Sequence, residues 1–328
     1  MRHPPQRRSS ANIGLMMLVL VLCLGCPGQW NSDQRQLEAR LKRFEEEEGW
    51  RVLVHKLGIQ YLDIRTASTT PLYLPPADTP DASYVGFASF SPDGTRITFG
   101  ENWGHERALI VFDLIERKNE ALLTMLYLEG ARWSPSGNEI AFQGRLSHIG
   151  NYSLYTYRLS DKKLSLLVEK DLRPGEPLFS WAPDGKSIVY EDSQGSIWIT
   201  DLDTRKRRKL GNGWFPTWSP NGRYIAYASV AEKDNQDPGY IVYDLQTGKK
   251  ESILAGKFAY RSLIWSPDSR YLVGSRASRG FWDLFGFRAE EPYGDLYVTD
   301  LESKVEVRVY SHSGSIFPAD WARSKALR

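Results

Sequence analysis

Short apolar runs alternate with polar turns along most of the chain, and one phrase recurs. FASFSPDGTRITFG at 87–100 returns in modified form at 130–144, 178–192, 215–229 and 262–276, with a truncated copy at 317–328. Each complete copy predicts a strand ending in an aromatic residue, a tight turn and a second strand. In Ser91-Pro92-Asp93-Gly94, proline presets φ, the polar side chains bond locally and glycine accepts a positive φ. Ser269 replaces this glycine in the fifth copy and should cost on the order of 1 kcal/mol if its φ is positive.

A second phrase, typical of a β-hairpin, lies between the copies of the first. It occupies 59–74, 108–123, 153–168, 196–210, 240–254 and 295–310. A period of roughly 40–50 residues with four short strands is typical of a propeller blade. The sequence therefore predicts an all-β fold, a six-bladed β-propeller over 50–328. We expect the last inner strand, 316–321, to complete a blade with the first strands at 50–55, 60–64 and 71–74, which closes the ring.

Repeated side chains have structural interpretations. One aromatic position is tryptophan in five copies, and we expect it to wedge between neighbouring sheets rather than form a ligand box: Trp133, Trp181, Trp218, Trp265 and Trp321. One aspartate position precedes the hairpin turns and is expected to cap them: Asp113, Asp201, Asp244 and Asp300.

The N-terminus has the pattern of an export signal. Polar and basic residues precede a 13-residue run, Ile13–Gly25, of apolar residues and glycine. That run is short of the roughly 20 residues of a membrane-spanning helix and suits a signal peptide over 1–25. Gly25-Cys26 resembles a bacterial lipoprotein signal, in which the cysteine becomes the lipid-attachment residue. Residues 26–49 are expected to form a tether, helical around Leu37 and Leu41, with docking to a partner as the alternative.

Charge and cysteine content exclude some classes of protein. The chain has 42 basic and 40 acidic residues, and three of the basic ones (Arg2, Arg7, Arg8) precede residue 26. The remainder therefore has 39 basic and 40 acidic residues, a net charge of −1, so no nucleic-acid partner is expected. The run Arg205-Lys206-Arg207-Arg208-Lys209 is interpreted as a solvated strand edge, with an anionic-lipid or nucleic-acid patch as the alternative. Two cysteines exclude a disulfide framework and a cysteine-rich zinc module.

The Trp-Ser-Pro-Asp-Gly phrase, followed by a strand and an Asp-Leu hairpin, resembles the TolB-type β-propeller repeat over roughly 50–328. The resemblance implies a periplasmic envelope protein that binds protein partners through its propeller. It does not extend to the additional N-terminal α/β domain of TolB, which we expect to be absent here. The repeat is also similar to propellers of prolyl-oligopeptidase-type peptidases and of oligogalacturonate lyase, so fold alone does not determine activity.

The candidate site lies on the face where loops join second to third strands and each blade to the next. These loops are expected at 100–107, 144–151, 211–215, 255–262 and 274–294. Aromatic and arginine residues there have the composition of an interface hot spot, although 274–294 could instead plug the channel. The candidate ligand-binding residues are Trp103, His105, His148, Trp214, Tyr260, Arg261, Arg279, Phe281, Trp282, Phe285 and His312.

Catalytic motifs are weak by comparison. His55, His105, His148 and His312 map to that face or its margin, but HERAL at 105–109 lacks the second histidine of a zinc-binding helix. Neither a G-x-S-x-G motif nor a P-loop occurs. We therefore expect a non-enzymatic, lipid-anchored protein that binds an envelope protein or peptide, with no cofactor or metal. The alternative is a glycan-active or metal-assisted propeller enzyme, similar to the lyase, that uses the histidines and arginines of this face.

Overall fold

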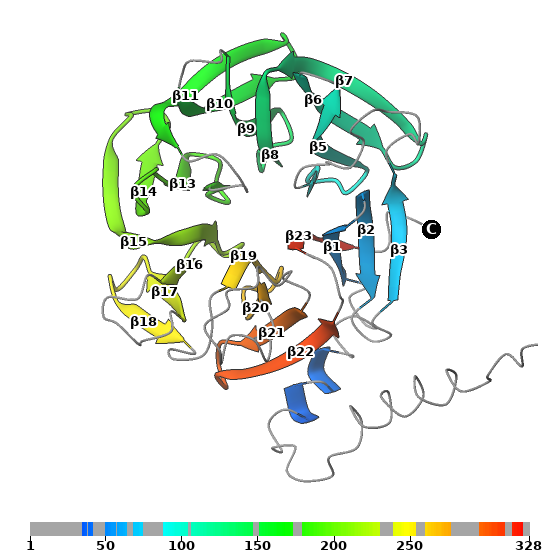
Figure 1. Ribbon diagram of the computed structural model, residues 1–328. Helices are drawn as coiled ribbons and strands as arrows, with labels where there is room; N and C mark the ends of the chain where they lie inside the picture. The colour runs from blue at the N-terminus through cyan, green and yellow to red at the C-terminus, as the bar shows by residue number, and fades with distance from the viewer. Residues whose placement is uncertain are drawn as a thin grey trace, which may run out of the picture.

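The strands are arranged as sheets around a central axis (Figure 1). The structure is a computed structural model that describes residues 35–37, 39–41, 50–56, 58–63, 68–74, 88–103, 106–146, 151–172, 179–229, 239–253, 260–276, 295–311 and 317–323. Residues 35–37 and 39–41 are helical and the other regular structure described is strand. Within these ranges no helix is long and apolar enough to cross a membrane.

Four of the five described sheets have four strands each, and three of these contain the first half of the propeller. The sheet that joins the two ends of the chain has the order β23-β1-β2-β3, at Phe317–Arg323, Trp50–Lys56, Gly58–Asp63 and Ser68–Tyr73. The next has the order β4-β5-β6-β7, at Ser89–Phe90, Arg96–Trp103, Glu106–Asp113 and Lys118–Met125. The third, from inside to outside, is β8-β9-β10-β11, at Tyr127–Trp133, Glu139–Arg145, Tyr152–Arg158 and Lys163–Leu172.

The other two sheets complete the circle. A seven-stranded sheet contains β12 to β18, at Phe179–Trp181, Ser187–Glu191, Ser196–Asp201, Arg207–Trp218, Tyr224–Ser229, Tyr240–Asp244 and Lys250–Ile253. The last sheet contains β19 to β22, at Tyr260–Trp265, Tyr271–Arg276, Asp295–Asp300 and Val305–Ser311. The predicted all-β propeller is therefore observed.

The two ends of the chain are joined by strand pairing. β23 pairs antiparallel with β1, in a register that places Trp321 opposite Val52 and Asp320 opposite Leu53. β1 also pairs with β2 on its other side, so neither edge of β1 is open. This is the pairing that the truncated last repeat predicts, and it removes an edge that could otherwise pair with another chain.

The structure corrects the prediction of a loop at 211–215. β15 runs without interruption from Arg207 to Trp218, pairing with β14 in its first half and with β16 in its second. Glycines allow this close passage, because a Cβ on Gly213 would lie 2.4 Å from the carbonyl oxygen of Ala228. The pairing partner of β15 changes between Asn212 and Gly213, and the register with β16 then shifts between Trp214 and Thr217, where Phe215 has φ 57°.

The Ser-Pro turns form as predicted. The amide of Gly94 donates to the carbonyl of Ser91 at 2.8 Å, and Gly94 has φ 71°. Ser269 has φ 61°, so the left-handed conformation is retained without glycine. Its hydroxyl accepts a hydrogen bond from the amide of Asn221 at 3.0 Å, in the turn of the neighbouring repeat. This bond offsets part of the expected cost of the serine.

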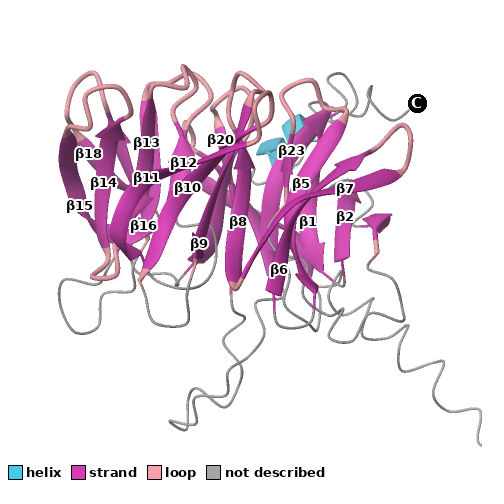
Figure 2. Ribbon diagram, turned by 90° about the horizontal axis from the view of Figure 1, so that it is seen from above, coloured by secondary structure: helices cyan, strands magenta, loops and turns pink. Residues whose placement is uncertain are grey.

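The hairpin aspartates cap their turns, as predicted. Asp113 Oδ1 accepts from the amides of Ile115 and Glu116 at 2.8 Å, and Asp244 Oδ1 accepts from Gln246 and Thr247 at 2.8 and 3.2 Å. The leucine after each aspartate forms a backbone hydrogen bond to the residue that follows the Ser-Pro turn of the same sheet. The Leu114 amide, for example, donates to the carbonyl of Thr95 at 2.9 Å. Both kinds of turn therefore share one face, the upper side in Figure 2, which we call the turn face. The opposite side is the connection face.

The hydrophobic core lies between sheets rather than within one layer. Five of the apolar clusters combine residues of two sheets that are neighbours around the axis, and the sixth lies between the two halves of the seven-stranded sheet. The repeated tryptophans contribute as predicted where their side chains are described, with Trp133 and Trp265 each 5% exposed and Trp181 9% exposed. Trp218 is half-buried, and the side chain of Trp321 lies outside the described residues.

The helical residues pack onto the propeller. Leu37 and Leu41 are buried in the cluster that β1 and β2 share with β20 and β21, and Arg40 lies 3.4 Å from the carboxylate of Asp300. Arg270 donates to the same carboxylate at 3.0 Å. The apolar stripe predicted for the tether is thus covered by this chain's own sheets at these two leucines.

Candidate functional site

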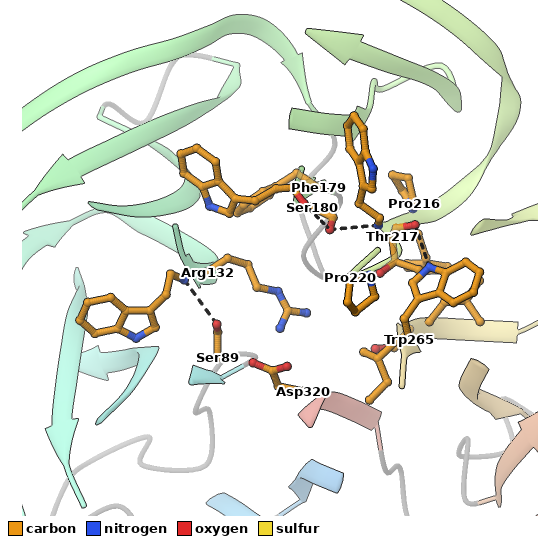
Figure 3. Close-up of a pocket in the computed structure, with 16 residues that line it drawn as sticks. Ser89, Arg132, Phe179, Ser180, Pro216, Thr217, Pro220, Trp265 and Asp320 are labelled. Carbon is orange, nitrogen blue, oxygen red and sulfur yellow. Dashed lines mark hydrogen bonds between the residues drawn. The ribbon is translucent and has the colours of Figure 1, made fainter. Parts of the chain in front are cut away.

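The innermost strands enclose a cavity on the propeller axis. Its volume is about 200 Å³. One lining position recurs around the axis, directly before the repeated aromatic residue of each inner strand: Ser89, Arg132, Ser180, Thr217, Ile264 and Asp320. We call these residues the channel ring (Figure 3). Because strand residues alternate in direction, the aromatic residue turns into the sheets and its predecessor faces the axis.

Aromatic and proline side chains form much of the remaining wall. Phe179 lines it from β12, and Phe215 and Pro216 line it from the irregular part of β15. The repeated tryptophans also border the cavity, although they pack between sheets: Trp133, Trp181, Trp218 and Trp265. Their contribution to a ligand-accessible wall was not predicted from the sequence.

The charges of the cavity come from Arg132 and Asp320. Among its described lining residues these are the charged ones, and both side chains point into the cavity in Figure 3. Arg132 Nη1 donates to the carbonyl of Ala88 at 3.3 Å. Burial lowers the pKa of the Arg132 guanidinium, while the Asp320 carboxylate opposes the shift. Arginine side chains keep their charge in proteins, so the cavity holds a buried positive charge.

Three side chains of the channel ring also accept hydrogen bonds from the backbone of the next inner strand. Ser89 Oγ accepts from the amide of Trp133 at 3.3 Å, and Ser180 Oγ accepts from the amide of Trp218 at 3.1 Å. Asp320 Oδ2 accepts from the amide of Phe90 at 3.0 Å. In each case the acceptor precedes an aromatic position and the donor is the aromatic residue of the following repeat. The cavity wall is therefore held at a fixed spacing.

A buried carboxylate positions the wall at Phe215. Glu191, at the end of β13, is 0% exposed, and its Oε2 accepts from the Phe215 amide at 3.1 Å. Phe215 has a positive φ, which is unfavourable for a bulky side chain, so contacts with surrounding residues must stabilise this conformation. The bond from Glu191 supplies one such contact and keeps the Phe215 ring beside the axis.

The residues predicted for the site are described only in part. Trp214 is half-buried, and its ring lies over the turn that joins β13 to β14, 3.0 Å from where a Cβ on Gly195 would be. Trp103 ends β5, and Tyr260 and Arg261 begin β19, but their side chains lie outside the described residues. The same is true of all atoms of Cys26, His105, His148, Arg279, Phe281, Trp282, Phe285 and His312. Their roles stay predictions.

The channel ring itself was missed by sequence reasoning. The signal was present, because polar residues stand where inner strands are otherwise apolar, and a lone arginine and a lone aspartate occur there in different repeats. With regard to metals, the described ranges hold no group of three or more His, Cys, Asp or Glu side chains arranged to bind an ion.

Comparison with known proteins supports the propeller fold. No family model matches the chain. It is 27% identical over 151 residues to dipeptidyl-peptidase 5 of Porphyromonas gingivalis, covering 35% of this chain and 22% of that one. It is 38% identical over 58 residues to the Tol-Pal system protein TolB of Alcanivorax borkumensis, covering 18% and 13%. The crystal structure of TolB from Acinetobacter baumannii superposes with a TM-score of 0.68 at 17% identity, covering 88% of this chain and 72% of that one.

These findings define the class of protein. The chain is an all-β propeller with a lined axial cavity, and its fold is that of TolB-like propellers. The matched regions span about a fifth or less of the length of the two curated relatives.

Proposed function

We propose that this chain is a non-enzymatic propeller protein of the cell envelope that binds a polypeptide partner at its axial cavity and connection face. We count the seven-stranded sheet as two blades sharing β15, which gives six blades. We further infer that residues 1–25 direct export and that Cys26 carries a lipid anchor. The similarity of a short segment to TolB, which is named as a Tol-Pal system protein, supports an envelope role.

The composition of the cavity is the observation that carries this proposal. The cavity wall is largely aromatic and contains one arginine and one aspartate. Hot spots of protein–protein interfaces have a similar composition, because they are enriched in aromatic residues and arginine that lie in pockets closed to water. A volume of about 200 Å³ lies below the roughly 300–1,000 Å³ of small-molecule sites. It offers room for one or two side chains, so a partner would insert part of an extended segment rather than a folded domain.

The charges suggest how the segment is oriented. Arg132 and Asp320 come from strands on either side of β4, and they present a donor and an acceptor across one sector of the ring. Peptide groups or a polar side chain of the partner can bond to both. The aromatic wall then removes apolar surface of the partner from water, and each fully buried large side chain contributes about 1.5–3 kcal/mol.

The binding proposal is tested by capture from solubilised membranes with tagged protein. We expect Arg132→Gln to reduce recovery of the partner at least about tenfold, because truncating a buried hot-spot arginine typically costs 2 kcal/mol or more. Arg158→Gln is the matched control, since Arg158 is exposed and pairs with Glu139 on the sheet surface. Equal recovery by the wild type and Arg132→Gln, with unchanged thermal midpoints, would exclude the cavity as the binding site.

The anchor is tested by Cys26→Ser. If Cys26 carries lipid, this variant should keep its uncleaved leader and lose the lipid mass in intact-protein mass spectrometry. A synonymous codon change at the same position serves as the control. Masses that differ only by the exchange of sulfur for oxygen would refute lipidation at Cys26.

A further inference from the structure

A stacked arginine lies where three strands meet at the connection face. Arg145 is the last residue of β9 and pairs in register with Tyr127, the first residue of β8. The centre of its guanidinium lies 3.8 Å from the centroid of the Tyr127 ring and 5.4 Å from that of Tyr152, which begins β10. The two rings contact edge to face at 5.9 Å. Arg145 thus lies over the face of Tyr127, with the Tyr152 ring beside it.

Stacking on a ring face does not use the N–H groups of the guanidinium. Its N–H groups point outward in the plane of the group, where they match the two oxygens of a carboxylate. Within the described part of the chain, no carboxylate forms an ion pair with Arg145, and its buried Nε has no hydrogen-bond partner. By contrast, carboxylates pair with Arg158, Arg223 and Arg270.

One carboxylate of this cluster is already engaged. Glu129, two residues after Tyr127 on β8, accepts from Arg107 Nη1 at 2.6 Å. The two arginines and one glutamate leave this cluster with one excess positive charge. Burial, followed by the negative charge of Glu129, raises the pKa of Tyr152 against the opposing effect of Arg145 and Arg107, so its hydroxyl remains a proton donor.

We propose that the Arg145 stack binds a carboxylate of the polypeptide partner; this deepens the proposed function and rests on it for the identity of the ligand class. β8 connects this site to the cavity, because it begins at Tyr127 and carries Arg132 in the channel ring. Five residues of strand correspond to roughly 16 Å at about 3.3 Å per residue. The partner would therefore present an acidic group about five extended residues from the side chain inserted in the cavity.

The test uses arginine-labelled full-length protein and three short peptides. The first has blocked ends and one glutamate, the second has glutamine and a free C-terminal carboxylate, and the third has glutamine and blocked ends. We expect the Nε–H resonance of Arg145, assigned by its loss in Arg145→Lys, to shift saturably with the first peptide, the second or both, and not with the third. The first two peptides distinguish a side-chain carboxylate from a terminal one.

Internal and variant controls make the result specific. The Arg158 resonance should stay unchanged, since that guanidinium already holds Glu139 at 2.9 Å and Asp161 at 3.4 Å. Arg145→Lys should weaken the affinity for the carboxylate peptides, measured for both proteins by calorimetry, at least about tenfold, because lysine lacks the planar fork. Arg158→Lys changes an exposed arginine outside the stack and should bind the peptides as the wild type does. Shifts that are equal for all three peptides, or absent for all three, would overturn the proposal.

Failure here is distinguishable from failure of the proposed function. The peptide titration requires no partner, so a carboxylate-specific shift at Arg145 stands even if capture through the cavity fails. Conversely, capture that depends on Arg132, together with no peptide response at Arg145, would retain the cavity and remove only the carboxylate site.

Discussion

Replacing Gly213 with alanine is expected to lower the free energy of unfolding by about 3 kcal/mol. A Cβ at this position would lie 2.4 Å from the carbonyl oxygen of Ala228 and 2.5 Å from Cδ2 of Tyr227. The first of these atoms belongs to the backbone of β16, so relief requires two paired strands to separate. β15 also leads into Phe215 and Thr217 of the cavity wall. The variant should therefore lose both stability and the geometry of the site.

Gly222→Ala is the matched control for this prediction. Gly222 has φ 75°, and a Cβ there would meet nothing within 4 Å. Its cost should be backbone strain alone, about 1 kcal/mol. Denaturant unfolding of both variants measures the difference. Equal destabilisation would show that β15 does not pass β16 as closely as described.

Deleting residues 317–328 is expected to lower the stability by more than about 4 kcal/mol, beyond the range of ordinary substitutions. The deletion removes β23, which pairs with β1 from Trp50 to His55. It also removes Asp320, whose carboxylate accepts a hydrogen bond from the Phe90 amide. β1 would then have an open edge, which is a site of aggregation. Unfolding curves and light scattering measure the two effects.

A rescue experiment separates ring closure from general damage. A synthetic peptide of residues 317–328, added in excess, should pair with β1 and restore a cooperative unfolding transition. The same peptide with Asp320→Asn should restore less stability, since the amide is a weaker acceptor for the Phe90 N–H. A truncated chain as stable as the full chain would contradict closure by the two ends.

The fold could be predicted because the repeat encodes it locally. Ser91-Pro92-Asp93-Gly94 specifies its turn through the chemistry of each residue, and Asp113 specifies the next turn by capping it. The aromatic positions between turns are buried between sheets, as their recurrence predicts. These signals lie within a few residues of the structure they determine.

Features that depend on the packing of distant segments were harder to predict. Gly211 and Gly213 look like a chain break in the sequence, but in the structure they allow one strand to pass close to another. The stripe of Leu37 and Leu41 was recognised, yet nothing in the sequence says that β1 and β20 cover it. The cavity was missed for the same reason, because Arg132 and Asp320 are 188 positions apart and become neighbours only when the ring closes.

Site-specific photo-crosslinking tests the central claim, that the axial cavity receives a partner polypeptide. A photoreactive residue is placed at Thr217, which lines the cavity from β15, and a second at Thr247, which lies exposed in a hairpin turn. Irradiation of intact cells should give one discrete adduct from position 217 and none from position 247, and Arg132→Gln should abolish that adduct. No adduct at position 217, or the same adducts from both positions, would contradict the account.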